Sequence, residues 1–212
     1  MKKILICFIF IFSLFCNKSF SVIETTPEFV FLQNIQDMKA DFTQKQFDGK
    51  NITRTYGSIL IKKPNSILLD HDGKDVKLRI LSVNGNVKMI DKDIGQTTYV
   101  DNQYSELMQF FTNNLKAEKL QLSTRNELCL EFQQIGEQLE ACLKIDLEKQ
   151  TVKYIDVFAI IEEQEKKNAV EKLKKAKKYQ IMNIVFRNVD INKGINDSEF
   201  IIKDNRIFGA DD

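Results

Sequence analysis

The side chains that could carry out catalysis are few in this sequence, and their spacing fits no nucleophile system. His71 is the only histidine among 212 residues, and it lies in an acidic stretch beside Gly73. A Ser–His or Cys–His pair needs a histidine that a third group orients, and a turn of this composition does not provide one. The sequence also contains no GxSxG elbow and no phosphate-binding glycine loop. We therefore expect a protein that is not an enzyme.

The residues around His71 also have the types that bind divalent cations. The stretch "DHDGKD", residues 70–75, holds three aspartates, but its glycine comes too early for an EF-hand calcium loop. Turns favour Asp and Gly, so a turn over residues 71–73 explains the stretch better. We expect no metal site and no cofactor.

The first 21 residues predict a signal peptide and hence a periplasmic protein. Lys2 and Lys3 form a positive start, and residues 4–15 are apolar but too few to span a bilayer. Residues 19–21 (Ser-Phe-Ser) match a cleavage site after Ser21. An uncleaved membrane anchor and a lipidated Cys16 are the alternatives. Cleavage takes the basic residues from 31 to 28 against 30 acidic ones, a balance that does not indicate nucleic-acid binding.

Two cysteines remain after this cleavage, Cys129 and Cys142. They lie at nearly equal distances from the turn around Gly136, so a hairpin would place them opposite each other on one face. In an oxidising compartment we expect a disulfide, which contributes roughly 3 kcal/mol in the chain-entropy picture. Two buried thiols are the alternative. The sequence has no CxxC redox motif, so we assign the pair no catalytic role.

Lys63 is the charged residue whose position raises a question. In "YGSILIKKPNSILLD", residues 56–70, two apolar runs flank a Lys-Lys-Pro-Asn break. Side chains alternate between the faces of a strand, so Lys63 shares a face with Ile59 and Ile61, the face that should meet a core. A lysine there indicates a polar contact at the end of the strand, where Pro64 ends it.

Most other residues predict an antiparallel meander in which each strand lies beside its neighbour in the sequence. Asn84-Gly85 between two alternating runs is a strong hairpin signal. The expected strands cover residues 52–62, 67–70, 76–83, 86–90, 96–100, 127–133, 138–145, 151–161, 179–189 and 198–203.

Three helical segments interrupt this pattern. Thr26 and Pro27 predict the start of an amphipathic helix that runs to about Lys39. Residues 105–120 carry an apolar stripe and predict a helix lying on one face of the sheet or across the mouth of a barrel. The stretch 162–178, with seven lysines and four glutamates, predicts a charged helical insertion. A solvated helix is the simpler interpretation, and a lipid-headgroup or partner contact is the alternative.

Four stretches together resemble a known family. They are "MKADFTQ" (38–44), "GSILIKKPN" (57–65), the predicted helix near 105–120, and "FRNVDINKGINDSEFIIKD" (186–204). In this order and spacing they resemble the periplasmic outer-membrane lipoprotein carriers, the LolA family, over nearly all of the mature chain. Each motif is short and mostly apolar, so their order carries the resemblance.

The resemblance implies a mainly β fold: an unclosed antiparallel β-barrel that encloses an apolar cavity, with helices as a lid. Residues 22–212 would then form a single, monomeric carrier domain with the insertion at 162–178. Such a carrier accepts acylated lipoproteins from an inner-membrane ABC transporter and delivers them to an outer-membrane receptor. The alternative is a non-catalytic envelope module with a structural or lipid-binding role. An envelope hydrolase is a third and weaker alternative.

The resemblance also implies the site residues. In the family a basic residue before a proline, usually arginine, bonds the lid and helps close the empty cavity, and Lys63 and Pro64 occupy these positions. Lysine in place of arginine, Asp204-Asn205 in place of a common proline, and the insertion are departures from the pattern. The residues expected to line the acyl-chain cavity are Phe42, Ile59, Ile61, Ile67, Leu69, Leu107, Phe110 and Phe111. For each of them, ordinary core packing is the alternative.

Overall fold

The computed structural model describes residues 23–73, 77–84, 86–100, 109–112, 115–134, 136–163 and 175–201. The signal peptide expected over residues 1–21 and the cavity residue Leu107 lie outside the described residues. Within the described ranges the strands form one eleven-stranded antiparallel sheet with the order β6-β5-β4-β3-β2-β1-β11-β10-β9-β8-β7. The strands are β1 (Asp37–Asp48), β2 (Asn51–Lys62), β3 (Ser66–Asp72), β4 (Lys77–Val83), β5 (Asn86–Asp91), β6 (Thr97–Val100), β7 (Leu120–Leu122), β8 (Glu127–Gln134), β9 (Glu137–Asp146), β10 (Thr151–Glu163) and β11 (Lys175–Ile191).

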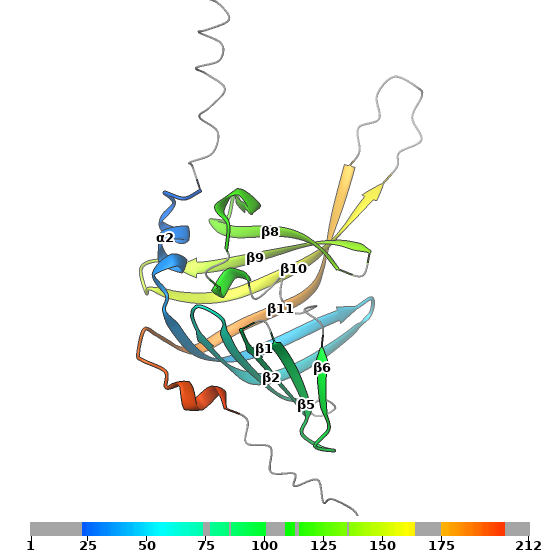
Figure 1. Ribbon diagram of the computed structural model, residues 1–212. Helices are drawn as coiled ribbons and strands as arrows, with labels where there is room; N and C mark the ends of the chain where they lie inside the picture. Colours follow the sequence, from blue (N-terminus) through cyan, green and yellow to red (C-terminus); the bar gives the residue numbers. More distant parts are fainter. Residues whose placement is uncertain are drawn as a thin grey trace, which may run out of the picture.

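The sheet is an unclosed meander, as the sequence predicted. Strands that follow one another in the sequence pair with each other, except for β6 and β7, and β1 also pairs with β11. The strands β6 and β7 stand at opposite ends of the order and do not pair with each other. Figure 1 shows the sheet bent over, with β8 to β10 lying opposite β1 to β6 and the helix α2 (Pro27–Asn34) near one end.

The hydrophobic core lies inside this bend. One cluster of buried residues joins α2, the first three strands, strands β8 to β11 and the 3-10 turn η1 (Gln109–Phe111). Burial of apolar side chains stabilises the bend at roughly 25 cal/mol per Å². A smaller cluster on the outer face of the sheet joins Leu60 and Leu81 to Ile195 and Phe200, and thereby fixes the C-terminal segment against β2 and β4.

The N-terminal helix is shorter than predicted. Thr26 caps α2, since its hydroxyl accepts from the backbone N–H of Phe29, but the helix ends at Asn34 rather than near Lys39. Residues from Asp37 onward join β1, where Met38 is fully buried and pairs with Ile61 of β2. Tertiary strand pairing here overrides the local helical spacing.

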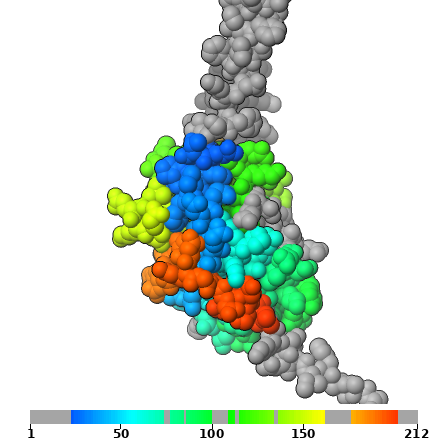
Figure 2. Space-filling view, turned by 60° about the vertical axis from the view of Figure 1, so that its left-hand side comes forward, coloured from blue at the N-terminus to red at the C-terminus, as the bar shows by residue number. Residues whose placement is uncertain are grey.

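The C-terminal segment crosses the start of β1. Asn192 Oδ1 accepts from the backbone N–H of Gln36 at 2.7 Å, and its side-chain amide donates to the carbonyl of Asn34 at 3.1 Å. Figure 2 shows this segment, in orange and red, directly below the blue of α2. The prediction of a strand at 198–203 is wrong for residues 198–201, the part that the structure describes. Its first residues belong to the 3-10 helix η3 (Asp197–Phe200), which Asn196 caps.

Two other predicted helices are corrected. Over 109–120 the structure has η1, a second 3-10 turn η2 (Ala117–Lys119) and the start of the edge strand β7 rather than one helix. At the end of this range, Leu120 pairs with Leu130 of β8, so strand pairing replaces the helix there. In the insertion expected at 162–178, the outer residues extend β10 and β11, with Glu163 paired to Lys175. The middle, 164–174, lies outside the described residues.

Candidate functional site

A cavity of about 250 Å³ lies between the two halves of the bent sheet. Its walls come from β1 to β4 on one side and from β10 and β11 on the other, while η1 contributes one aromatic ring. Most of the lining is apolar. The apolar lining residues are Phe42, Ile59, Leu69, Leu78, Ile80, Phe111, Ile155, Met182, Ile184 and Phe186.

Strand alternation brings these residues to one face. Phe42 of β1 pairs with Phe186 of β11, and Ile59 of β2 pairs with Leu69 of β3. The turn η1 inserts Phe111, whose ring meets that of Phe186 edge-on with centroids 6.4 Å apart. Paired strands and a short turn therefore assemble the wall. The described residues 109–112 form this turn and not a long lid helix.

Four of the eight residues expected in the cavity lie in its wall: Phe42, Ile59, Leu69 and Phe111. Three others, Ile61, Ile67 and Phe110, are buried in the core cluster but are not part of the wall. Ile61 and Ile67 pair with each other. This pair lies closer to the end of β2 at Lys62 than the lining pair Ile59 and Leu69 does, and neighbouring side chains bury it there. Leu107 lies outside the described residues.

Several lining residues were missed from the sequence. The residues missed are Ile155 of β10, Met182, Ile184 and Phe186 of β11, Leu78 and Ile80 of β4, and the polar residues Gln44, Gln46, Thr53 and Thr55 of β1 and β2. The alternation Phe42-Gln44-Gln46 and the spacing of Ile184 and Phe186 were available signals. They did not identify the wall, because the bend that makes β11 face β3 depends on contacts distant in the sequence.

His71 is part of the cavity wall rather than of a turn, which corrects the expectation for residues 71–73. It belongs to β3 and is buried, and its ring meets that of Phe42 edge-on with centroids 5.1 Å apart. Burial lowers the pKa of His71; the Asp70 carboxylate opposes this shift, and the Lys92 ammonium adds to it. The imidazole in the wall is therefore held toward its neutral form.

Gly57 makes room for this aromatic pair. It stands opposite Phe42 on one side and His71 on the other. A Cβ atom at Gly57 would lie 2.6 Å from Cζ of Phe42 and 2.0 Å from the backbone oxygen of Asp70. A glycine is thus needed for Phe42 to lie across β2.

The aspartates beside His71 are engaged in ion pairs. The Asp70 carboxylate pairs with Arg79 and, at 2.6 Å, with Lys92, which also lies 3.5 Å from Asp72. Burial alone would raise the pKa of Asp70, but hydrogen bonds from Lys92 and Arg79 outweigh it, so that its pKa is lowered. Charge pairing between β3, β4 and the turn after β5 therefore accounts for Asp70 and Asp72, while Asp75 lies outside the described residues.

The Lys63 ammonium contacts the last turn of α2. Its Nζ donates to the carbonyl oxygen of Leu32 at 2.7 Å and to that of Gln33 at 3.3 Å. The backbone N–H of Lys63 also donates to the carbonyl of Gln36 at 2.8 Å. The last carbonyls of a helix lack partners and carry negative partial charge, so an ammonium fits there. Burial lowers the pKa of Lys63.

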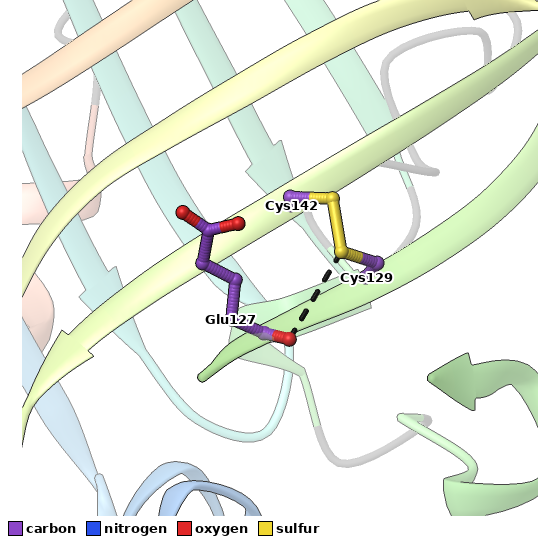
Figure 3. A group of neighbouring side chains, drawn as sticks. All are labelled: Glu127, Cys129 and Cys142. Carbon is purple, nitrogen blue, oxygen red and sulfur yellow. Dashed lines mark hydrogen bonds between the residues drawn. A yellow bond between two sulfur atoms is a disulfide. The ribbon is translucent and has the colours of Figure 1, made fainter. Parts of the chain in front are cut away.

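Cys129 and Cys142 form a disulfide across the β8–β9 hairpin (Figure 3), where they are direct partners with Cα atoms 4.0 Å apart. Glu127 lies beside it, with its backbone carbonyl 4.0 Å from the Cys129 sulfur. These three residues are the one group of three possible metal ligands in the described part of the chain. The disulfide occupies both sulfurs, which are thereby unsuited to bind a metal as thiolates.

The Glu127 carboxylate has two other partners. It accepts from the Tyr154 hydroxyl at 2.7 Å and from the Ser123 hydroxyl at 3.1 Å. Burial first, and then the hydrogen bond to Glu127, raise the pKa of Tyr154 to about 12. The polar groups around the disulfide are thus mutually satisfied, and we assign this cluster a structural role.

These features define a class of protein: an unclosed antiparallel sheet bent around an apolar cavity, with a short helix bonded to the end of one wall strand. No family model matches the chain. Over 67 residues it is 45% identical to the outer-membrane lipoprotein carrier protein of Francisella tularensis subsp. tularensis (strain WY96-3418), which is 30% of this chain and 31% of that relative. The carrier of subsp. novicida (strain U112) is 43% identical over 67 residues.

The chain therefore spans about a third of the length of the curated relatives that it matches. Within that span, this similarity confirms the resemblance to the lipoprotein carriers that the sequence predicted. Among solved structures, a LolA superfamily protein from Nitrosomonas europaea covers 82% of this chain and 96% of its own, at 9% identity and a TM-score of 0.42. A lipoprotein-sorting protein domain from Vibrio parahaemolyticus covers 77% and 88%, at 7% identity and a TM-score of 0.40. TM-scores this low decide nothing about function.

One observation bears on membranes. No helix in the described part of the chain is long and apolar enough to cross a bilayer.

Proposed function

We propose that the protein is a non-catalytic periplasmic carrier that binds the acyl chains of lipoproteins released from the inner membrane and delivers them to the outer membrane. The observation that carries the proposal is the apolar cavity inside the bent sheet. Burial of an acyl chain is favourable by roughly 0.8 kcal/mol per CH₂ group, so a long chain can cross water only inside an apolar cavity of this kind. The local similarity to lipoprotein carriers supports the same assignment.

The size of the cavity supports a carrier that opens. At about 250 Å³ it lies near the lower limit of ligand pockets, which typically measure roughly 300–1,000 Å³. Several acyl chains therefore require the two halves of the sheet to move apart. The described form corresponds in this proposal to the closed, unloaded carrier.

The contact between Lys63 and α2 is the proposed latch. Its bonds to the carbonyls of Leu32 and Gln33 join the end of β2 to the helix. Entering lipid would break these bonds and displace α2, with Pro64 marking the end of the strand that holds the latch. Lysine offers three donors on a flexible stem, whereas arginine offers five in a rigid fork. We therefore propose a weaker latch than that of an arginine-bearing carrier.

The partners follow from this role. The protein would receive lipoproteins from an inner-membrane ABC transporter, pass them to an outer-membrane receptor, and act as a monomer after removal of residues 1–21. An envelope module that never releases lipid is the competing assignment. Transfer between two membranes therefore provides the test that separates them.

The test uses the mature protein and vesicles that contain acylated lipoproteins together with their release transporter. The expected result is energy-dependent release of lipoprotein into a complex of one carrier and one lipoprotein, detected by native mass spectrometry. Ile184→Glu, which places a charge in the cavity wall, should abolish the complex. Val185→Glu, on the other face of the same strand, is the matched control and should retain it. A folded protein that never takes up lipoprotein would overturn the proposal.

A further inference from the structure

One part of the cavity wall is polar. Five polar residues, here called the polar row, line it on three adjacent strands: Gln44, Gln46, Thr53, Thr55 and His71. Gln44 of β1 stands directly opposite Thr55 of β2, and Gln46 stands opposite Thr53. They continue the face of Phe42 along the two strands toward the β1–β2 turn, away from Lys63.

The cavity opens at this polar part of the wall. Gln46 and Thr53 are exposed, whereas Phe42 and Ile59 of the same two strands are buried. A ligand that enters here with its apolar end first would reach Ile59 and the ring of Phe111 deeper in the cavity. Its polar part would remain beside the polar row, near the mouth.

Thr55 indicates which chemical group the polar row binds. Its hydroxyl oxygen is buried, and it is the one buried side-chain nitrogen or oxygen in the described part of the chain without a hydrogen-bond partner. Leaving such a group unpaired typically costs roughly 1–3 kcal/mol, and native proteins contain few of them. Thr55 is one of the residues that line the cavity, so its hydroxyl would be satisfied when a ligand brings an acceptor within reach of this side chain.

The neighbouring side chains favour the same partner. A glutamine offers an NH₂ donor, a threonine an O–H donor and a neutral histidine an N–H donor. A hydrocarbon chain can use none of these donors, whereas the carbonyl oxygen of an ester accepts from all three. The polar row holds no charged side chain to pair with a fatty-acid carboxylate or a phosphate. A neutral acceptor is therefore the ligand group that the polar row fits.

We infer that the polar row binds the ester carbonyl groups of a diacylglycerol moiety, with the Thr55 hydroxyl as the principal donor, and so orients the acyl chains toward Ile59 and Phe111. This inference rests on the proposed function and specifies how that site recognises its ligand. It makes the cavity selective for ester-linked acyl chains over chains that lack a carbonyl.

The test compares two ligands that differ only in the carbonyls: dioctanoylglycerol and its dioctyl diether analogue. Displacement of a fluorescent fatty-acid probe measures both affinities for the mature protein. The wild type should bind the diester about three- to tenfold more tightly, the range expected for one or two net hydrogen bonds. Thr55→Val removes the hydroxyl with little change of shape, and the ratio should fall to near one. Thr43→Val on the outer face of β1, outside the cavity wall, is the matched control and should keep the wild-type ratio.

The outcomes separate this inference from the proposed function. Equal affinities for the diester and diether forms of both the glycerolipid and the lipopeptide, or ratios that stay unchanged in Thr55→Val, would overturn the inference while lipid binding itself still stood. Binding of neither ligand and of no lipoprotein would overturn both. A synthetic diacylglyceryl lipopeptide and its diether form, tested in parallel, identify the source of the esters. If the ratio of diester to diether affinity depends on Thr55 for the lipopeptide alone, the polar row is assigned to lipoproteins. If it depends on Thr55 for the lipopeptide and for dioctanoylglycerol, the polar row is assigned to diacylglycerol esters in general. Thermal unfolding of each variant verifies that it is folded.

Discussion

The Lys63 ammonium lies 2.7 Å from the carbonyl oxygen of Leu32. This hydrogen bond joins the end of β2 to the last turn of α2. This bond crosses 31 positions of the sequence, and it connects the helix to the end of a strand that contributes Thr53, Thr55 and Ile59 to the cavity wall. A helix of eight residues is too short to be stable by itself. Its position therefore depends on such contacts and on the burial of Phe31 and Leu32.

Replacing this ammonium should loosen α2. In Lys63→Leu the carbonyls of Leu32 and Gln33 lose the ammonium donor, although the backbone N–H of Ile35 still donates to Leu32 at 3.3 Å. We expect a loss of about 1 kcal/mol in the free energy of unfolding, since the site is only partly buried. Lipid uptake should become faster and retention weaker, as measured by stopped-flow fluorescence with a labelled acyl probe. Lys63→Arg keeps a donor at this place and should retain lipid at least as well as the wild type. Identical kinetics in Lys63→Leu and the wild type would remove Lys63 from the mechanism.

Gly57 should tolerate no side chain. In Gly57→Ala the new methyl group would lie 2.6 Å from the Phe42 ring and 2.0 Å from the Asp70 backbone oxygen, so the ring or the β2–β3 pairing must shift. Overpacking of this kind typically costs about 2 kcal/mol, which urea unfolding would measure. Adding Phe42→Leu should recover only part of the loss, because the contact with the Asp70 backbone remains. Full recovery in the double variant would show that the ring alone requires the glycine.

The strands of the meander could be predicted because their signals are local. Asn84, with a positive φ of 51°, stands at the turn between β4 and β5, as the Asn-Gly pair in the sequence indicated. The Cys129–Cys142 register likewise depends on one short hairpin. In both cases the deciding contacts lie within about fifteen residues, so spacing alone identified the partners.

The errors arose where distant contacts decide. Met38 continues the helical spacing of the residues before it, yet its pairing with Ile61 and Ile191 places it in a strand. His71 lies between two aspartates that suggest a turn, yet pairing with Gly57 and Leu78 extends β3 through it. The three residues that β11 contributes to the cavity wall were missed for the same reason, because the bend of the sheet is not encoded in any one strand.

The disulfide should stabilise the β8–β9 hairpin and little else. It closes a loop with a sequence separation of 13, for which the chain-entropy estimate is roughly 3 kcal/mol. The double variant Cys129→Ala, Cys142→Ala should lose about this much in chemical denaturation. Wild-type protein in reducing agent should lose a similar amount, whereas the double variant should not respond to reduction. Lipid affinity should remain unchanged in the folded variant, since neither cysteine lines the cavity. A loss of lipid binding without unfolding would contradict this structural role.

Acidification should destabilise the protein through His71. Burial holds the folded-state pKa of His71 below its ordinary value of 6.5, so in acid the unfolded chain takes up a proton before the folded chain does. The free energy of unfolding should therefore decrease as the pH falls through about 6.5, and continue to decrease down to the folded-state pKa. His71 is the only histidine, and carboxylates titrate mainly below this window. Urea unfolding at pH 7.5, 6.5 and 5.5 should show the decrease in the wild type and a much smaller one in His71→Gln. Equal slopes in the two proteins would mean that His71 titrates as it does in the unfolded chain.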